Sequence, residues 1–538
     1  MANRTFTSDH SRSQVYARKG WIDKLWLVGL FLCAIVLYGV NLGNQPLVDL
    51  GNEGTVAQIA REIYQSFPQS NKWIYPTLWG EPYINHPPFL YVLIAIAYHF
   101  GGVNEWTIRL PSALLSALSV PLLYLIGKEI FTVRLPALLA AFIYLTSLPI
   151  LHYGRLAIID SAVLCFFLLM MWCVLRSRRD LRFALGIGIS LGLICLTKGL
   201  EGLLLSLVGL IFLIWDTPRL LTSVYLWTGI IIGSAPISAW YWSQWLKYKQ
   251  LLLDEMIKDL EWFKFGLHFS SIWYYLLAIC SPFLLFFKKA LSDAHENQNL
   301  SRGKLVIAWL ITSIIVVLLM PTKDAGFLLP IYPGIALAIA GYLGSMPNLP
   351  GGKSYPKFQA ICLFFLGIIT FIFSVYSFNS PSIDIYVKLV LIASTITFFV
   401  AAKLIAQRDI QFIHILIWGN YVALILLMMS PYAIWNINQL YPVENVALML
   451  EKNSPTHVKI YTSFPVERPA LNFYSQRQVI AISPAQIKAY WEQNDHDYFL
   501  LEESELTQLN LHSYKEVAKI DTPKPDAMIW VLVTHQDS

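Results

Sequence analysis

The sequence predicts a polytopic all-α membrane protein with about thirteen transmembrane helices, followed by a small C-terminal α/β domain. Of its 538 residues, 56% are hydrophobic and only 14% are charged, whereas soluble domains carry roughly 25% charged residues. Many of its apolar runs are long enough to cross a hydrocarbon core of about 30 Å. The apolar character ends near Trp435. Most of the chain is therefore expected in lipid and its tail outside it.

The first apolar run extends from Trp21 to Asn41 and follows a basic N-terminal segment. It lacks the small-residue cleavage pattern of a signal peptide, which predicts an uncleaved helix with its N-terminus in the cytoplasm. All six cysteines lie within apolar runs. This placement is typical of packing residues and indicates neither a disulfide framework nor a thiolate metal site.

A long polar segment, Pro46–Pro88, interrupts the apolar chain after this first run. Long loops are usually functional or disordered, and the tryptophans and tyrosines of this segment argue against disorder. We therefore expect an active-site loop, as part of a first external loop spanning residues 44–107. A solvated linker with interfacial aromatic residues is the alternative.

Basic residues indicate which side of the membrane each connection occupies. The run 87–102 is short for a span. If it does not cross, the connections rich in Lys and Arg all fall in the cytoplasm. The thirteen crossing runs are then 21–41, 108–127, 134–152, 161–176, 183–197, 200–215, 220–241, 272–288, 304–320, 325–344, 358–378, 387–405 and 412–430. The protein is thus expected in a cell (inner or plasma) membrane, with a cytoplasmic N-terminus and an extracytoplasmic C-terminus.

The same topology gathers ionisable residues on the external face. Charged residues close to a membrane are costly and often functional, although some of them serve as interfacial anchors. The residues that share this face are Asp49, Glu53, His86, Arg155, Asp160, Lys198, His268 and Lys323. A one-sided cluster of carboxylates and cations favours an enzyme site.

The predicted domain boundary separates a catalytic transmembrane domain, residues 1–434, from an extracytoplasmic α/β domain, residues 435–538. Four short segments of the tail have the composition of strands: KIYTSF, QVIAI, DYFLLEE and AMIWVLV. The segment SPAQIKAYWEQN predicts a helix with Ser483 as its N-cap.

The residue types on the external face, and the motifs that the chain lacks, limit the classes of reaction to consider. The chain has no GxxxxGK[ST] phosphate loop, no HExxH and no GxSxG, which removes support for nucleotide hydrolysis, zinc proteolysis and hydrolase triads. The net charge of +5 gives no indication of nucleic acid binding. Cations suit a phosphate held at the membrane surface, and a carboxylate suits a general base that deprotonates an acceptor. These groups favour transfer from a lipid-phosphate donor.

Several segments, taken in order, resemble the GT-C class of membrane glycosyltransferases, in particular the branch of protein O-mannosyltransferases and lipid A aminoarabinose transferases. The first-loop acidic motif of that family is resembled by PLVDLGNEGTVAQIAREI, and its KPP segment by INHPPFLYV. The family order is then followed by RLPSALLSALSVPLLYLIGKEIF, YGRLAIIDSAV, LTKGLEGLLL and PTKDAGFLLPIYPGIALAIAG. The resemblance implies the GT-C fold. It also implies inverting transfer of a sugar from a polyprenyl-phosphate donor to a lipid, glycan or protein acceptor on the non-cytoplasmic face.

The resemblance also assigns roles to residues. Asn52 stands where the family has the first acid of an Asp-Glu pair, and an amide is not a base, so the catalytic base is expected to be Asp49 or Glu53. Asp160 is the third catalytic residue, expected in the same cavity, where it orients the acceptor or a cationic partner. The donor phosphate is expected to be held by His86, Arg155, Lys198 and Lys323.

Two departures from the family pattern affect this site. Phe327 occupies a position often held by tyrosine, which removes one hydroxyl from the donor site. His86 and His268 could together hold a divalent cation. Two histidines so far apart in sequence are more often hydrogen-bonded interfacial residues, so no metal ligand is assigned.

A transporter or flippase is the main alternative from another class of protein. It would place ionisable residues near mid-membrane and show an inverted repeat, whereas the chain shows no such repeat. A non-catalytic GT-C relative that only binds a lipid-linked sugar is the second alternative, because of Asn52. The sequence identifies neither the sugar nor the acceptor.

Overall fold

The structure is a computed structural model that describes residues 6–48, 52–261, 282–319, 325–346, 355–381, 383–431, 443–456, 458–464, 467–493, 498–509, 511, 514–521 and 529–535. The chain divides into two compact units. The bundle comprises Met1–Asn41, Ile84–Phe89 and Ser112–Ala433, and the loop–tail unit comprises Leu42–Tyr83, Leu90–Pro111 and Ile434–Ser538.

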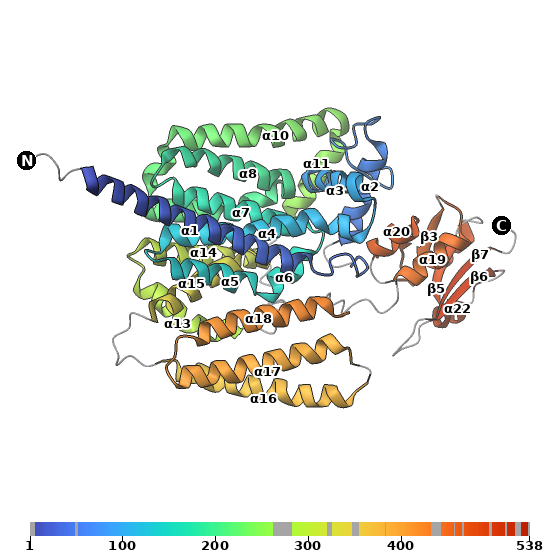
Figure 1. The fold of residues 1–538 in the computed structure, drawn as a ribbon. Helices are drawn as coiled ribbons and strands as arrows, with labels where there is room; N and C mark the ends of the chain where they lie inside the picture. The colour runs from blue at the N-terminus through green and yellow to red at the C-terminus, as the bar shows by residue number, and fades with distance from the viewer. Residues whose placement is uncertain are drawn as a thin grey trace, which may run out of the picture. The chain divides into compact units, whose positions relative to one another are not determined.

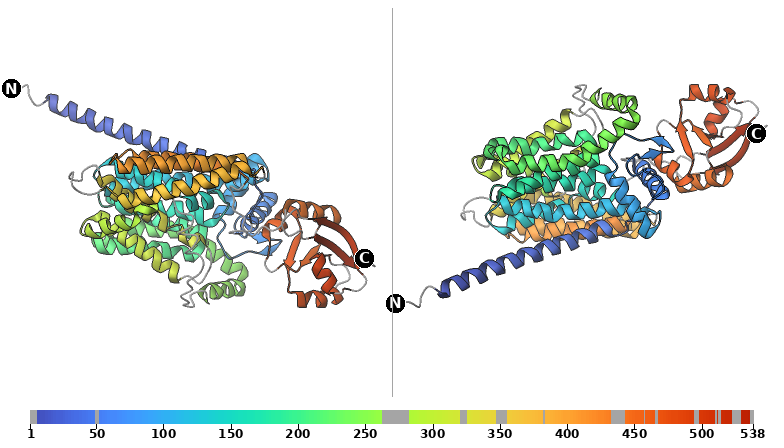
Figure 2. Two further views of the ribbon diagram at one scale, coloured as in Figure 1. Left: turned by 90° about the horizontal axis from the view of Figure 1, so that it is seen from below. Right: turned by 90° about the horizontal axis from the view of Figure 1, so that it is seen from above.

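The bundle is built from helices that lie side by side (Figures 1 and 2). Its long helices are α1 (Phe6–Gly39), α4 (Glu105–Ile130), α5 (Arg134–Leu145), α6 (Leu148–Arg155), α7 (Ile159–Arg176), α8 (Ala184–Lys198), α9 (Leu203–Asp216), α10 (Val224–Tyr248), α11 (Gln250–Glu261), α13 (Phe287–Glu296), α14 (Ser301–Leu319), α15 (Ile331–Ser345), α16 (Lys357–Asn379), α17 (Ile385–Ala406) and α18 (Phe412–Met429). Short 3-10 turns connect them: η2 (Leu181–Phe183), η3 (Gly199–Gly202), η4 (Pro218–Thr222), η5 (Pro282–Phe286) and η6 (Ala325–Leu328). The predicted all-α membrane bundle is confirmed.

Within the described residues, nine helical stretches are long and apolar enough to cross a membrane, or ten if the bent pair α5–α6 is one span. The run predicted over 134–152 is that pair, bent by 59° where Ser147 and Pro149 start the new helix. The run 87–102 forms only the short helix Phe89–Gly101, in keeping with the prediction that it does not cross. Most of the predicted span 272–288 lies outside the described residues.

Helices α8 and α10 are parallel, and glycine residues lie at their contact. A Cβ on Gly188 would lie 2.1 Å from the backbone of Gly229, and one on Gly192 would lie 2.0 Å from the carbonyl oxygen of Gly233. The two GxxxG segments therefore face each other in register, a device that lets membrane helices approach closely. Any side chain at these four positions would push the helices apart.

The stretch Leu181–Asp216 consequently doubles back and accounts for two of the predicted crossings. Helices α8 and α10 can be parallel only if α9, which joins them, runs the opposite way. The ion pair between Arg178 and Asp216, 3.5 Å apart, shows that α9 returns to the end at which α8 began. The reversal occurs at Gly199, whose φ of 75° is readily adopted by glycine.

Gly192→Ala is expected to destabilise the bundle by about 1–3 kcal/mol, because its methyl group overlaps the Gly233 carbonyl and the close-packed interface must open. Unfolding of the purified protein by SDS titration measures the change. Gly209→Ala in α9 is the matched control, since its Cβ would meet only Met170, Met171 and Val174 side chains at 3.6 Å. Equal stability of the two variants would contradict the interpretation of the α8–α10 contact.

The loop–tail unit contains the predicted active-site loop. Helix α2 (Glu53–Ser66) is followed by a small hairpin of β1 (Thr77–Leu78) and β2 (Glu81–Pro82) and by α3 (Phe89–Gly101). Helix α2 packs on α20 (Pro469–Ser475) of the tail. A Cβ on Gly54 would lie 2.3 Å from the Pro469 backbone, so only glycine permits this contact.

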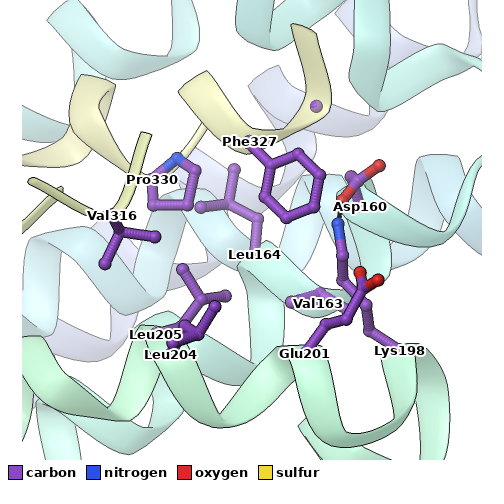
Figure 3. Close-up of a pocket in the computed structure, with 11 residues that line it drawn as sticks. Asp160, Val163, Leu164, Lys198, Glu201, Leu204, Leu205, Val316, Phe327 and Pro330 are labelled. Carbon is purple, nitrogen blue, oxygen red and sulfur yellow. Dashed lines mark hydrogen bonds and ion pairs between the residues drawn. The ribbon is translucent and has the colours of Figure 1, made fainter. Parts of the chain in front are cut away.

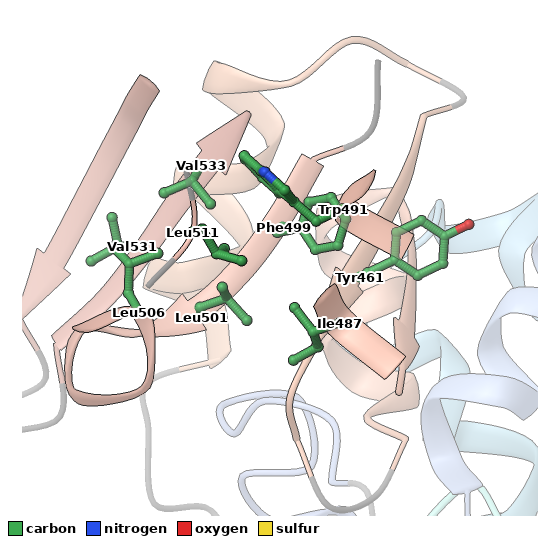
Figure 4. Close-up of a cluster of buried hydrophobic side chains, with 9 residues drawn as sticks. All are labelled: Tyr461, Ile487, Trp491, Phe499, Leu501, Leu506, Leu511, Val531 and Val533. Carbon is green, nitrogen blue, oxygen red and sulfur yellow. The ribbon is translucent and has the colours of Figure 1, made fainter. Parts of the chain in front are cut away.

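The tail forms a five-stranded mixed sheet in the order β4-β3-β5-β7-β6. The strands are β3 (Lys459–Thr462), β4 (Gln478–Ala481), β5 (Tyr498–Glu502), β6 (Tyr514–Asp521) and β7 (Ile529–His535), and the helices are α19 (Val443–Asn453), α20, α21 (Pro484–Gln493) and α22 (Glu503–Leu509). Side chains from β3, β5, β7, α21 and α22 fill one core (Figure 4). Ser483 directly precedes α21, and its backbone N–H and hydroxyl both donate to the Gln486 side-chain oxygen, which is the Gln half of a capping box.

The grouping of segments passes from the bundle to the tail between Ala433 and Ile434, and it joins segments of the first external loop to the tail. The loop Leu42–Tyr83 belongs with the tail and not with the transmembrane helices. Two contacts tie this loop to the tail: Arg61 donates to the Phe473 carbonyl, and the Leu47 N–H donates to the Tyr474 hydroxyl. Tyr474 also donates to Glu105 at the start of α4. The topology inferred from basic residues also puts both segments on one face of the membrane.

Candidate active site

Three helix ends of the bundle bring Asp160, Lys198 and Phe327 together (Figure 3). Asp160 lies in the first turn of α7, Lys198 is the last residue of α8, and Phe327 belongs to η6. The Lys198 ammonium forms an ion pair with the Asp160 carboxylate and lies 3.6 Å from the centroid of the Phe327 ring. The two charged side chains are only 8% and 14% exposed. Because water is largely excluded, they act more strongly on a ligand than surface charges do.

Two glycines permit this convergence. A Cβ on Gly326 would lie 2.3 Å from a carboxylate oxygen of Asp160, so a larger residue there would displace that carboxylate. Gly199 turns the chain directly after Lys198 with a positive φ, and its Cβ position lies 3.1 Å from the Tyr241 hydroxyl. Helix α8 therefore ends with Lys198, and Gly199 reverses the chain directly after it.

A narrow pocket lies beside the ion pair (Figure 3). Its free volume is about 10 Å³, which is room for roughly one water molecule. Glu201 contributes another carboxylate, and the rest of the wall is apolar: Val163, Leu164, Leu204, Leu205, Val316, Phe327 and Pro330. A ligand that fits such a wall has an apolar part and a charged or polar part.

His86 lies beside the same ion pair. Its ring forms a hydrogen bond with the Lys198 carbonyl, and its buried Nδ1 atom has no hydrogen-bond partner among the described residues. Burial, followed by the nearby Lys198 ammonium, lowers the pKa of His86 to about 4, although the Asp160 carboxylate opposes this effect. His86 is therefore neutral at pH 7 in this structure.

Lowering the pH from 7 to 5 should destabilise the protein through His86. The ordinary pKa of 6.5 applies in the unfolded chain, while the folded chain resists protonation down to about 4. The stability contributed by the neutral ring is therefore complete above pH 6.5 and is lost as the pH falls toward 4, by about 1–2 kcal/mol at pH 5.

His86→Gln keeps an N–H donor but does not titrate, so it should remove this part of the pH dependence. Thermal unfolding in a nonionic detergent at both pH values measures it. His414→Gln, on the exposed face of α18, serves as the control. A pH dependence that is the same in all three proteins would refute the assignment.

Arg155 is buried at the end of α6 and connects this helix to α1. Its Nη1 atom donates to the carbonyl oxygens of Leu37 and Tyr38, both at 3.0 Å. These carbonyls belong to the last turn of α1, where helices leave carbonyl groups without intrahelical partners. The structure thus gives Arg155 a capping contact in addition to the phosphate-binding role predicted for it.

Glu53 is completely buried and pairs with Arg109 inside the loop–tail unit. Arg109 donates to the two carboxylate oxygens from Nε and Nη2, at 2.8 Å each. The same carboxylate accepts the Val48 N–H at 3.0 Å. Such a bidentate arrangement makes a strong ion pair, and it leaves the Glu53 carboxylate enclosed by protein in this structure.

Arg109 also fixes the segment that precedes Asp49. Its guanidinium donates to the carbonyl oxygens of Leu42, Gln45 and Pro46 at 2.8–3.2 Å. Sequence reasoning missed this residue. The sequence offered one indication of its role: Arg109 begins the RLPSALL segment, near the start of a predicted span.

Glu62 orders the remainder of the loop. Its carboxylate accepts from the backbone N–H of Trp79 at 2.6 Å, from the Thr77 hydroxyl and from Lys72. These contacts tie the β1–β2 hairpin to α2. The loop is therefore a packed structure, in agreement with its aromatic content and not with a solvated linker.

Two of the predicted site residues, Asp49 and Lys323, lie outside the described residues, as does the external histidine His268. Within the residues that the structure does describe, no three His, Cys, Asp or Glu side chains are grouped as a metal site would require.

Residues 85–242 match the family model of dolichyl-phosphate-mannose-protein mannosyltransferases. The undecaprenyl phosphate-alpha-4-amino-4-deoxy-L-arabinose arabinosyl transferase of Yersinia enterocolitica is 23% identical over 348 residues, which are 60% of this chain and 59% of that enzyme. A protein of Aquifex aeolicus described as uncharacterized is 26% identical over 341 residues, 62% of this chain and 65% of that protein. The chain thus spans less than two thirds of the length of these relatives.

Two solved structures share the fold over nearly the whole chain. ArnT from Cupriavidus metallidurans bound to undecaprenyl phosphate has a TM-score of 0.71 at 15% identity, covering 94% of this chain and 98% of that one. The apo state of ArnT has the same TM-score at 16% identity. The chain has the GT-C fold, and its resemblance to GT-C glycosyltransferases of the aminoarabinose-transferase branch is confirmed.

Proposed function

We propose that this protein is an inverting glycosyltransferase that moves a sugar from a polyprenyl-phosphate donor to a lipid, glycan or protein acceptor. The fold shared with ArnT, which was solved with undecaprenyl phosphate bound, supports a donor of this kind. The apolar helices support a multi-pass membrane location. The distribution of basic residues favours a cytoplasmic N-terminus and a reaction on the non-cytoplasmic face.

The observation that carries the proposal is the shielded Lys198–Asp160 pair in a pocket whose remaining wall, apart from Glu201, is apolar. A polyprenyl phosphate combines a hydrocarbon chain with an anionic phosphate, so the apolar wall suits the first part and the Lys198 ammonium suits the second. The pocket has room for roughly one water molecule. Entry of the donor therefore requires the Phe327 ring to move from its position over Lys198.

Asp160 and the donor phosphate compete for Lys198 in this proposal. When the phosphate pairs with the Lys198 ammonium group, the Asp160 carboxylate loses its partner. It can then accept a hydrogen bond from a hydroxyl or ammonium group of the sugar or the acceptor. His86 keeps its ring on the Lys198 carbonyl and so holds the end of α8 in place. Its Nδ1 atom remains available to accept a hydrogen bond from a ligand.

Asp49 supplies the general base. Inverting transfer needs one base on the acceptor side, because the lipid phosphate leaves without being protonated. The burial of Glu53 and the Arg109 guanidinium on both of its oxygens favour Asp49 over Glu53 for this role. We assign to the Glu53–Arg109 pair the positioning of the segment that leads to Asp49.

A transfer assay tests the proposal. The purified protein is incubated with undecaprenyl phosphate-linked 4-amino-4-deoxy-L-arabinose and with a lipid-linked sugar pool, each with and without lipid acceptors. Acceptor-dependent release of undecaprenyl phosphate, with inversion at the anomeric carbon, is the expected result. Donor binding without release would indicate a non-catalytic relative. Movement of intact donor across vesicle membranes would indicate a flippase.

A further inference from the structure

A second pocket lies in the bundle at the end opposite to Lys198. It is enclosed by the last turn of α7 with the residues that follow it, by the end of α4 and by η4, and its volume is about 330 Å³. Pockets that bind small molecules begin near 300 Å³. Because α8 starts at this end and finishes at Lys198, the second pocket is separated from the candidate active site by the length of that helix.

The second pocket is strongly basic. Arg178, Arg179 and Arg219 line it, together with the single carboxylate of Glu129. That carboxylate is already engaged, because Arg176 and Arg179 lie 3.0 and 3.2 Å from its two oxygens. Arg219 is exposed and forms no ion pair within the part of the chain that the structure describes. Arg178 is paired with Asp216, so the excess of positive charge comes from Arg219 and from the two arginines that share Glu129, and it suits an anion.

Thr217 supplies an independent observation. Its hydroxyl oxygen lines this pocket, is buried, and has no hydrogen-bond partner among the described residues. Buried hydroxyl groups in proteins are almost always hydrogen-bonded. A ligand oxygen in the pocket would provide the missing partner, as phosphate oxygens do for the hydroxyl groups of Ser and Thr.

Exposed tryptophans place this pocket at a bilayer surface. Trp215 and Trp227 flank η4 with side chains that are 43% and 57% exposed, and the Trp227 ring donates to the Leu221 carbonyl. Tryptophan is enriched where lipid headgroups meet the hydrocarbon region. Basic pockets between membrane helices at this depth bind anionic lipid headgroups.

We propose that this second pocket binds the phosphate of an anionic glycerophospholipid, with Arg179, Arg219 and the Thr217 hydroxyl as its ligands. A phosphate of this kind has oxygens for all three groups, and its acyl chains extend along the apolar surface next to Trp215. The site does not depend on the proposed transfer reaction. The basic residues that form it are those predicted to lie on the cytoplasmic face.

Native mass spectrometry of the full-length protein with phosphatidylglycerol, and separately with phosphatidylcholine, tests the site. Phosphatidylglycerol should be bound preferentially. Arg179→Gln with Arg219→Gln should weaken its binding on the order of twentyfold, since each basic residue near an anionic headgroup contributes roughly fivefold. Arg408→Gln, an exposed arginine on the α17–α18 connection, is the control and should bind as the wild type does. Equal losses in the control and the double variant would overturn the proposal.

Thr217→Val separates a ligand role from a structural one. Because it removes a buried hydroxyl without a partner, thermal stability without lipid should be kept or raised, while the stabilisation produced by phosphatidylglycerol should shrink. An unchanged response to lipid would overturn the assignment of Thr217. Inorganic phosphate is the second arm. If millimolar phosphate stabilises the wild type as much as phosphatidylglycerol does, the ligand is a soluble anion and the lipid proposal fails.

Discussion

Asp49→Asn is expected to lower the rate of sugar transfer by roughly 10²–10⁴-fold, because an amide cannot take the proton of the acceptor. Binding of the donor should be kept, since the phosphate is held by other residues. Single-turnover release of undecaprenyl phosphate, measured at saturating donor, gives the rate. Equilibrium binding of undecaprenyl phosphate to the same preparation gives the affinity.

Asp49→Glu is the control for this substitution. It preserves a carboxylate and should retain part of the rate. If Asp49→Asn transfers sugar as fast as the wild type, the base is another residue and the proposed mechanism is wrong in its first step.

Glu53→Gln is expected to destabilise the protein by about 3–5 kcal/mol, because it leaves the buried Arg109 guanidinium without its counter-charge. The two groups are buried on all sides, so water cannot compensate the charge. Unfolding of the loop–tail unit, followed by the fluorescence of its tryptophans during a urea titration, measures the loss. Turnover should fall in proportion to the unfolded fraction and not beyond it.

The double variant Glu53→Met with Arg109→Met removes both charges at once. Well-packed apolar side chains often replace a buried ion pair with little loss of stability, so this variant should recover part of the stability lost in Glu53→Gln. Recovery stays partial because the carbonyl groups of Gln45 and Pro46 lose their donor. A folded Glu53→Gln protein of normal stability and no turnover would show that Glu53 is the base.

The fold was predictable where the signal is local. The length of the apolar runs and the basic residues beside them predicted the helices of the bundle. Short runs of β-branched and aromatic residues predicted four strands of the tail. Strand β6, Tyr514–Asp521, was not predicted, because four of its eight residues are charged and interrupt the apolar pattern. It lies at the edge of the sheet beside β7, where charged residues are common because they discourage pairing with other chains.

The site was predictable only in part. Asp160 and Lys198 are 38 residues apart, on the consecutive helices α7 and α8 that pack against each other. Periodicity does not reveal the close approach of Gly326 to the Asp160 carboxylate. Glu53 and Arg109 are 56 residues apart, and both are charged residues of ordinary appearance. No local pattern distinguishes an acid that is enclosed by an arginine from one that faces a substrate. The neutral state of His86 likewise follows from its burial beside Lys198. Burial of this kind cannot be read from the sequence.

Binding of undecaprenyl phosphate to the Lys198 pocket is the most direct test of the account. Lys198→Ala removes one charge-assisted hydrogen bond, worth about 1.5–3 kcal/mol, so affinity should fall roughly ten- to a hundredfold. Asp160→Asn removes the competing carboxylate and should leave affinity unchanged or raised. Lys304→Ala, which breaks a comparable lysine–aspartate pair at the other end of the bundle, should bind as the wild type does. Equal affinities of Lys198→Ala and Lys304→Ala would contradict the donor site.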